Sequence, residues 1–185
     1  MARHLGTRKG NTPLKSLVLM AVLAAAAIPS TPDLGKAEGQ CRVNEAGPAF
    51  LVTVVGLKDR RGRLKLEVYP DNDRDFLADD NVLLQQGRTF RRVEVRVPGD
   101  PEPTLCIRVP RPGHYALSLL HDRDSNRKFG LSVDGIGFSG NPRLGMSKPK
   151  AASVRIAAGA GVTPVRIVLN YRSGVFSFSP IGARS

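Results

Sequence analysis

The chain has 185 residues, of which 41% are hydrophobic, 24% are charged and 5% are aromatic. This length and composition fit one domain with a hydrophobic core, and they exclude a collagen, a coiled coil and a wholly disordered chain. The formal net charge of +12 favours anionic partners, although charge alone identifies neither a fold nor a ligand.

The first 39 residues have the organisation of a secretory signal peptide. Residues 1–16 carry basic and no acidic side chains, and residues 17–28 are an unbroken apolar run that is followed by prolines and polar residues. This run is shorter than the roughly 20 residues of a membrane-spanning helix. Small residues permit cleavage after Ala37 or Gly39, and we favour Gly39. We therefore predict a periplasmic or secreted protein that is not transmembrane after processing.

Export narrows the range of partners and predicts a disulfide. Nucleic acid is not expected as a partner because the compartment lacks it, whereas an anionic envelope polymer or another envelope protein is available there. The chain has two cysteines, Cys41 and Cys106, and both lie beyond the signal peptide. Two cysteines outside the cytosol predict one disulfide. The bridge would tie an N-terminal arm, residues 40–49, to the domain that follows.

Beyond the arm, the sequence has the pattern of half-buried β-strands. A continuous apolar run or an alternation of polar and apolar residues occupies residues 50–55, 63–69, 92–97, 105–109, 115–119 and 164–169. Gly- and Pro-rich turns separate these segments, and one short helix is predicted within residues 76–86. The prediction is an all-β fold, a single antiparallel β-sandwich of the immunoglobulin or prealbumin type over residues 50–171, with at most one short helix. Residues 172–185 are predicted to be a C-terminal tail.

Motifs in the same region resemble those of a bacterial family. They include Gly62-x-Leu64-x-Leu66-x-Val68-Tyr69, Val109-Pro110-Arg111-Pro112-Gly113-His114-Tyr115, His121-Asp122-x-Asp124-x-Asn126 and Gly135-x-Gly137-Phe138-Ser139. In this combination they resemble the uncharacterised family known as domain of unknown function 2141. The resemblance implies an exported β-sandwich, and it implies no particular activity because the family has none assigned.

One of these motifs carries a candidate calcium site. Asp122, Asp124 and Asn126 place side-chain oxygens at the first, third and fifth positions of a loop, which is how a calcium loop begins. Arg127 stands where such a loop has its glycine, so a polar hairpin turn is the competing interpretation. The acidic loop at residues 71–75 repeats the spacing and is predicted to be a solvated turn. No cofactor other than calcium is suggested.

The sequence offers no clear catalytic pair. His114 and His121 stand seven residues apart on one predicted strand, so their side chains are expected on opposite faces. The nearest candidate nucleophiles are Ser118 and Ser139, and neither lies in a nucleophile elbow. We therefore predict that the protein is not an enzyme. A pocket that brought His114, His121, Asp122 and Ser139 together would reverse that prediction.

Five basic residues occupy positions of the predicted strands whose side chains should point away from the core. The set is Arg63, Lys65, Arg96, Arg108 and Arg166. Such side chains keep sheet edges soluble, which makes a solvated face the simpler interpretation. The alternative is an anion-binding face that meets an envelope polymer.

Taken together, the sequence predicts an exported, non-catalytic binding or structural module, with a calcium-stabilised adhesion or matrix domain and an enzyme of unidentified type as alternatives.

Overall fold

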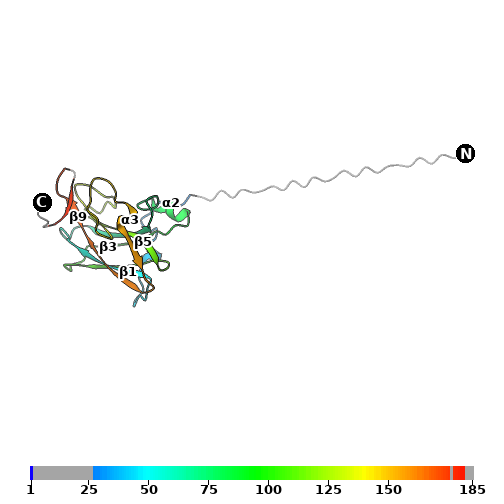
Figure 1. Ribbon diagram of the computed structural model, residues 1–185, viewed down its shortest axis with the longest axis horizontal. Coiled ribbons are helices and arrows are strands. Elements are labelled where there is room, and N and C mark those ends of the chain that lie inside the picture. The colour runs from blue at the N-terminus through cyan, green and yellow to red at the C-terminus, as the bar shows by residue number, and fades with distance from the viewer. Residues whose placement is uncertain (2–26, 176, 182–185) are drawn as a thin grey trace.

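The computed structural model describes residue 1 and residues 27–175 and 177–181. Most of the predicted signal peptide therefore lies outside the described residues. In chain order, the elements are α1 (Lys36–Gly39), β1 (Ala49–Val55), β2 (Arg63–Pro70), α2 (Asp80–Gln85), β3 (Arg91–Arg96), β4 (Thr104–Arg108), β5 (Gly113–Asp122), β6 (Gly135–Phe138), α3 (Ala151–Val154), β7 (Arg155–Ala158), β8 (Val162–Val168), β9 (Asn170–Arg172) and β10 (Phe178–Pro180) (Figure 1). The all-β class is confirmed. The described residues contain three short helices, however, where at most one was predicted.

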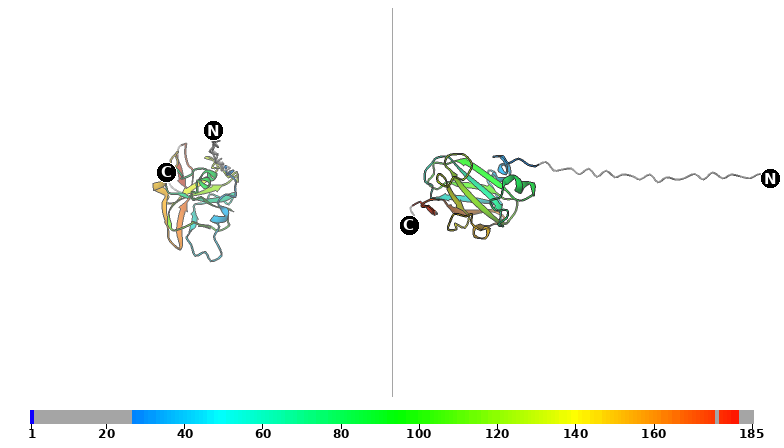
Figure 2. Two further views of the ribbon diagram at one scale, coloured as in Figure 1. Left: turned by 90° about the vertical axis from the view of Figure 1, so that its right-hand side faces the viewer. Right: turned by 90° about the horizontal axis from the view of Figure 1, so that it is seen from above.

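The strands form two sheets that pack face to face (Figures 1 and 2). The smaller sheet has the order β4-β1-β8, and the larger has the order β10-β9-β6-β5-β2-β3, with β7 pairing with β5. Among the described strands, β1 and β8 run parallel and the other pairs run antiparallel. The parallel pair departs from the predicted antiparallel sandwich. It is possible because most of the domain lies between β1 and β8 and supplies the long crossover that parallel strands need.

The alternation along the strands explains where the main core lies. Leu64, Leu66 and Val68 of β2 are completely buried, and they belong to one cluster with Phe50 of β1 and Ile107 of β4. Successive side chains of a strand point to opposite faces, so the intervening residues of β2 lie on the outer face of the larger sheet. The inner faces of the two sheets thus make the core that the sequence predicted.

A second hydrophobic cluster covers part of the outer face of the larger sheet. The Tyr69 ring contacts Phe76 and Phe90 edge to face, with ring centroids 5.8 and 5.4 Å apart. Phe138 of β6 and Leu83 of α2 also belong to this cluster. Strand β5 is consequently buried on both faces. The alternation of polar and apolar residues along strands cannot predict this layer, because the apolar residues of the layer come mostly from the loops and helices that fold over the sheet.

Within the predicted C-terminal tail, residues Phe178–Pro180 form the short strand β10. Strand β10 pairs with β9, and β9 pairs with β6. The sequence pattern did not predict strand β6, because glycines occupy its positions that face the core. At Gly137 an added Cβ would lie 2.6 Å from the Val168 carbonyl oxygen, and at Gly135 it would meet the Tyr171 ring. These two glycines allow the close approach of the following strands.

Candidate functional site

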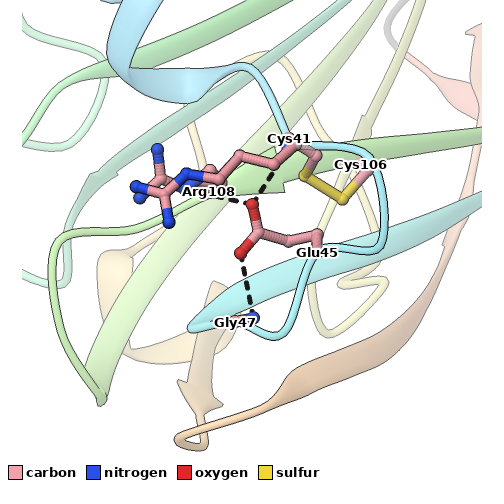
Figure 3. Close-up of a disulfide and its surroundings, with 6 residues drawn as sticks. Cys41, Glu45, Gly47, Cys106 and Arg108 are labelled. Carbon is pink, nitrogen blue, oxygen red and sulfur yellow. Dashed lines mark hydrogen bonds and ion pairs between the residues drawn. A yellow bond between two sulfur atoms is a disulfide. The ribbon is translucent and has the colours of Figure 1, made fainter.

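The predicted disulfide between Cys41 and Cys106 is present, with the two Cα atoms 5.8 Å apart (Figure 3). It joins the N-terminal arm to β4. Beside it, the Glu45 carboxylate accepts a hydrogen bond from the Gly47 backbone N–H at 3.0 Å and lies 3.1 Å from Arg108 Nε (Figure 3). The backbone hydrogen bonds to Glu45 lower the pKa of its carboxyl group, with a smaller contribution from Arg108. Covalent and ionic contacts therefore hold the arm on the smaller sheet.

The basic residues of the predicted anion-binding face do not share a face. Arg63, Lys65 and Arg96 belong to the larger sheet, whereas Arg108 and Arg166 belong to the smaller one. The outer faces of two packed sheets point in opposite directions, so a single anionic surface cannot lie against all five residues. Four of them also have carboxylate partners at 3.1 to 3.4 Å, namely Arg63 with Glu94, Lys65 with Glu67, Arg108 with Glu45 and Arg166 with Glu102.

His121 has a structural position in the core. It is completely buried, and its Nε2 donates a hydrogen bond to the Arg61 carbonyl oxygen at 2.9 Å. Its Nδ1 then accepts a hydrogen bond from the Tyr171 hydroxyl at 2.6 Å. Burial lowers the pKa of His121, which favours the neutral ring. Both ring nitrogens are engaged, so this side chain holds the loop between β1 and β2 against β9.

The four side chains whose convergence would have indicated an enzyme lie apart. His114 is exposed near the start of β5, and His121 and Asp122 stand at its far end, a separation of about 23 Å along a strand. The Ser139 hydroxyl is buried, accepts the Leu117 backbone N–H at 3.0 Å and donates to a backbone carbonyl. These residues do not form a shared pocket.

The candidate calcium residues belong to a cluster of carboxylates. Oxygens of Asp122, Asp124 and Asp134 lie within 4.8 Å of one another. Asp134 lies outside the predicted loop, and the residue spacing did not predict that it would join the other two. Asp122 accepts the backbone N–H groups of Asn126 and Arg127 at 3.1 and 2.8 Å, and Asp134 accepts two further N–H groups of the same loop. Burial raises the pKa of Asp122, and a hydrogen bond with Asp124 adds to this effect. The buried carboxylates thus fold the loop, and calcium binding remains a prediction from the sequence.

The second acidic loop, residues 71–75, lies at the opposite end of the sandwich. In the pairing of β2 with β5, Arg63 stands opposite Asp122 and Pro70 stands opposite Tyr115. The loop that follows Pro70 is therefore a full strand length away from Asp122. Its carboxylates are bound by basic side chains and by backbone N–H groups. The two acidic loops cannot form a joint cation site.

A cleft of about 520 Å³ lies on the outer face of the larger sheet. Strands β2, β5 and β6 supply its floor as two cross-strand rows of side chains. The rows are Glu67–Ser118–Phe138 and Lys65–Leu120–Ile136. Three neighbouring strands in fixed register thus build a floor that is apolar toward β6 and charged toward β2.

Loops and the last described strand form the walls of the cleft. Phe129 and Leu131 come from the loop between β5 and β6, residues 144–149 come from the loop after β6, and Phe178 comes from β10. The Phe129 and Phe178 rings pack with their centroids 6.0 Å apart. Phe129, Leu131 and Met146 are nevertheless 42%, 46% and 52% exposed. Apolar side chains therefore surround the mouth of the cleft and remain open to solvent.

Two lysines line the cleft, and only one of them forms a salt bridge within the described residues. The Glu67 carboxylate, 5% exposed, lies 2.8 Å from Arg92 Nε and 3.4 Å from Lys65 Nζ, and the Tyr69 hydroxyl donates to it at 2.8 Å. Its charge is thus compensated. Lys148 Nζ donates instead to two backbone carbonyls, and within the described residues no carboxylate lies within 4.0 Å of it.

Residues 52–166 match the model of DUF2141, a family of uncharacterised proteins conserved in bacteria. The chain belongs to this family. No curated protein and no solved structure matches it. The DUF2141 match runs from β1 into β8 and includes every residue that lines the cleft except Phe178. The family resemblance in the motifs is confirmed, and the cleft belongs mainly to the part of the chain that defines the family.

The cleft of this DUF2141 protein was not visible in the strand pattern. Its floor depends on the register of three strands, and its walls come from loops that the pattern treats as polar. The available signal was the presence of Phe129, Leu131 and Met146 in those loops, since large apolar residues are unusual in solvated turns. Every helix that the structure describes falls well short of the length and apolarity needed to cross a bilayer.

Proposed function

We propose that the protein is an exported, non-catalytic binding module whose outer-face cleft holds a small apolar molecule with an acidic group. The observation that carries this proposal is the combination of an apolar cleft, exposed aromatic and aliphatic side chains at its mouth, and a lysine, Lys148, whose Nζ contacts backbone carbonyls and forms no salt bridge within the described residues. Export is supported by the signal-like N-terminus and by the disulfide, because disulfides persist in oxidising compartments.

The size and the lining of the cleft favour a small ligand. Ligand pockets commonly have volumes of about 300–1,000 Å³ and combine apolar walls with a few polar groups. The cleft fits this description, with Leu120, Ile136 and Phe138 in its floor and Phe129 and Leu131 in its wall. Exposed apolar patches of this kind often mark binding sites, because an occupant would remove them from water.

The charge of the lining favours an acidic group on the ligand. Glu67 is fully compensated by Arg92 and Lys65, so it does not repel an anion strongly. Lys148 lines the same cleft and can add an anionic partner to the two carbonyl oxygens it already contacts. An extended anionic polymer is less suited to this site, because the basic strand residues are divided between the two sheets.

Dodecanoate is a suitable probe of this site, with dodecanol as its uncharged counterpart. Isothermal titration of the purified protein should show saturable binding of dodecanoate at one site. Leu131→Glu should weaken binding at least tenfold, because it places a negative charge at the apolar mouth, and a tenfold loss corresponds to about 1.4 kcal/mol. Leu131 is half exposed, so this substitution leaves the core intact.

Two controls separate binding from loss of structure and from nonspecific charge effects. Val82→Glu introduces the same charge at a similarly exposed residue of α2, away from the cleft, and should leave binding unchanged. Lys148→Met should weaken dodecanoate binding but not dodecanol binding. Lys150→Met removes a neighbouring lysine that is exposed and does not line the cleft, and it should affect neither ligand. Equal binding by wild type and Leu131→Glu, or no binding of dodecanoate, would contradict the proposal.

A further inference from the structure

The segment just before the disulfide is built into the domain. It contacts the edge strands of both sheets: the Arg92 backbone N–H of β3 donates to the Gly35 carbonyl oxygen at 3.1 Å, and Gln40 forms a bridge with Ile107 of β4. Strands β3 and β4 are the terminal strands of their sheets. Helix α1 (Lys36–Gly39) therefore closes one side of the sandwich and covers strand edges that would otherwise be open.

A buried ionic network depends on the same segment. Arg92 donates to Glu67 at 2.8 Å and to Asp80 at 2.9 Å, and it also donates to the carbonyl oxygens of Thr31 and Pro32 at 3.2 and 3.4 Å. The segment thus supplies acceptors to a guanidinium that is only 9% exposed. Buried donors that lose their acceptors are destabilising, so the network is complete only when this segment is present.

Further contacts extend back to Ile28. The Ser30 hydroxyl donates to Asp80 at 2.6 Å, and the Asn81 side-chain amide donates to the Ile28 carbonyl oxygen at 3.0 Å. Lys36 Nζ lies 3.3 Å from the almost completely buried carboxylate of Glu94. Cleavage after Ala37 or Gly39 would remove all of these groups from the mature protein.

Two glycines show how closely the segment fits the sheet. Gly35 has a φ of +74°, and a Cβ there would lie 2.9 Å from the Phe90 ring. At Gly39 a Cβ would lie 2.9 Å from the Arg92 carbonyl oxygen. Such close backbone approach is typical of an integral part of a domain, because a segment that is discarded does not need it.

We infer that signal-peptide cleavage follows Ala27, so that the exported protein begins at Ile28 and retains α1. Ala25 and Ala27 are small residues at the third and first positions before this bond, and they lie at the end of the apolar run. A signal peptide of 27 residues also falls within the usual length of about 15–30 residues, whereas one of 39 residues does not. This inference rests on the export component of the proposed function and is independent of the cleft.

The test uses the full-length precursor expressed in a bacterium, with intact mass and N-terminal sequence measured on the exported protein. Wild type should begin at Ile28. Ala27→Leu should reduce the amount of processed protein or shift its N-terminus. Ala37→Leu is the matched control, since Ala37 is exposed and is the first or third residue before the two alternative bonds. It should leave both the N-terminus and the yield unchanged.

The contradicting results can be distinguished from one another. An N-terminus at Glu38 or Gln40, or a block of processing by Ala37→Leu, would overturn the cleavage inference and leave export intact. An unprocessed precursor that remains in the cytoplasm would overturn export and the cleavage inference together. Neither result bears on ligand binding by the purified domain.

Discussion

At the residue scale, His121 couples the stability of the domain to pH. The ring is buried between the Arg61 carbonyl and the Tyr171 hydroxyl, and burial lowers the pKa of His121 from its usual 6.5. The unfolded chain therefore takes up a proton at a pH where the folded chain does not. Since stability rises with pH wherever the unfolded state binds more protons, this histidine makes the domain less stable as the pH falls below about 6.5.

Replacing His121 should reduce that pH dependence. The free energy of unfolding, measured by urea denaturation at pH 7.5 and 5.5, should fall with pH in the wild type and fall less in His121→Gln. Exposed His114 provides the control, and His114→Gln should retain the wild-type difference. Equal pH dependence in wild type and His121→Gln would show that the buried ring does not resist protonation.

A turn glycine provides a second test at this scale. Gly62, in the turn before β2, has a φ of +73°, and an added Cβ would collide with the Asp122 carbonyl oxygen. Gly62→Ala should lower the free energy of unfolding by about 1–3 kcal/mol, the cost of strained backbone at a non-glycine residue. At Gly99 an added Cβ meets no atom within 4 Å, so Gly99→Ala should have little effect. Chemical denaturation compares the two, and similar effects would contradict the turn geometry.

At the scale of elements, the disulfide fastens the N-terminal arm to β4. The bridge spans 65 residues, and the loss of chain entropy in the unfolded state predicts a stabilisation of about 4 kcal/mol. The double substitution Cys41→Ala and Cys106→Ala should therefore lower the urea midpoint strongly. A thiol reductant should lower the urea midpoint of the wild type by a similar amount. The same reductant should leave the midpoint of the double variant unchanged. If neither the double substitution nor reduction of the wild type lowered the midpoint, the disulfide would have no stabilising role.

Strands were predictable wherever polar and apolar residues alternate. The six predicted segments correspond to β1, β2, β3, β4, β5 and β8, since one face of each lies in the main core or packs against it. Strand β6 was missed because its glycines are needed for close packing. Strand β10 was missed because it is only three residues long and lies between segments without alternation. Short edge strands depend on pairing rather than on local pattern, which a single sequence does not reveal.

At the scale of the whole molecule, tertiary structure decided where the candidate residues lie. The disulfide was predictable because two cysteines leave one pairing. The proposed anion-binding face required the basic strands to share a sheet, and the topology places Arg108 and Arg166 on the other one. The cleft requires β2, β5 and β6 to be neighbours and two loops to fold over them. Residue spacing reveals neither which strands share a sheet nor which loops fold over them.

The cleft as the ligand site can be tested most directly by backbone amide NMR during a titration with dodecanoate. The amide signals of residues in the cleft, such as Leu120, Leu131 and Ile136, should shift in a saturable manner. Signals from the outer face of the smaller sheet, including Arg108 and Arg166, should not move. Shifts confined to the smaller sheet, or no saturable shifts at all, would contradict the proposed site.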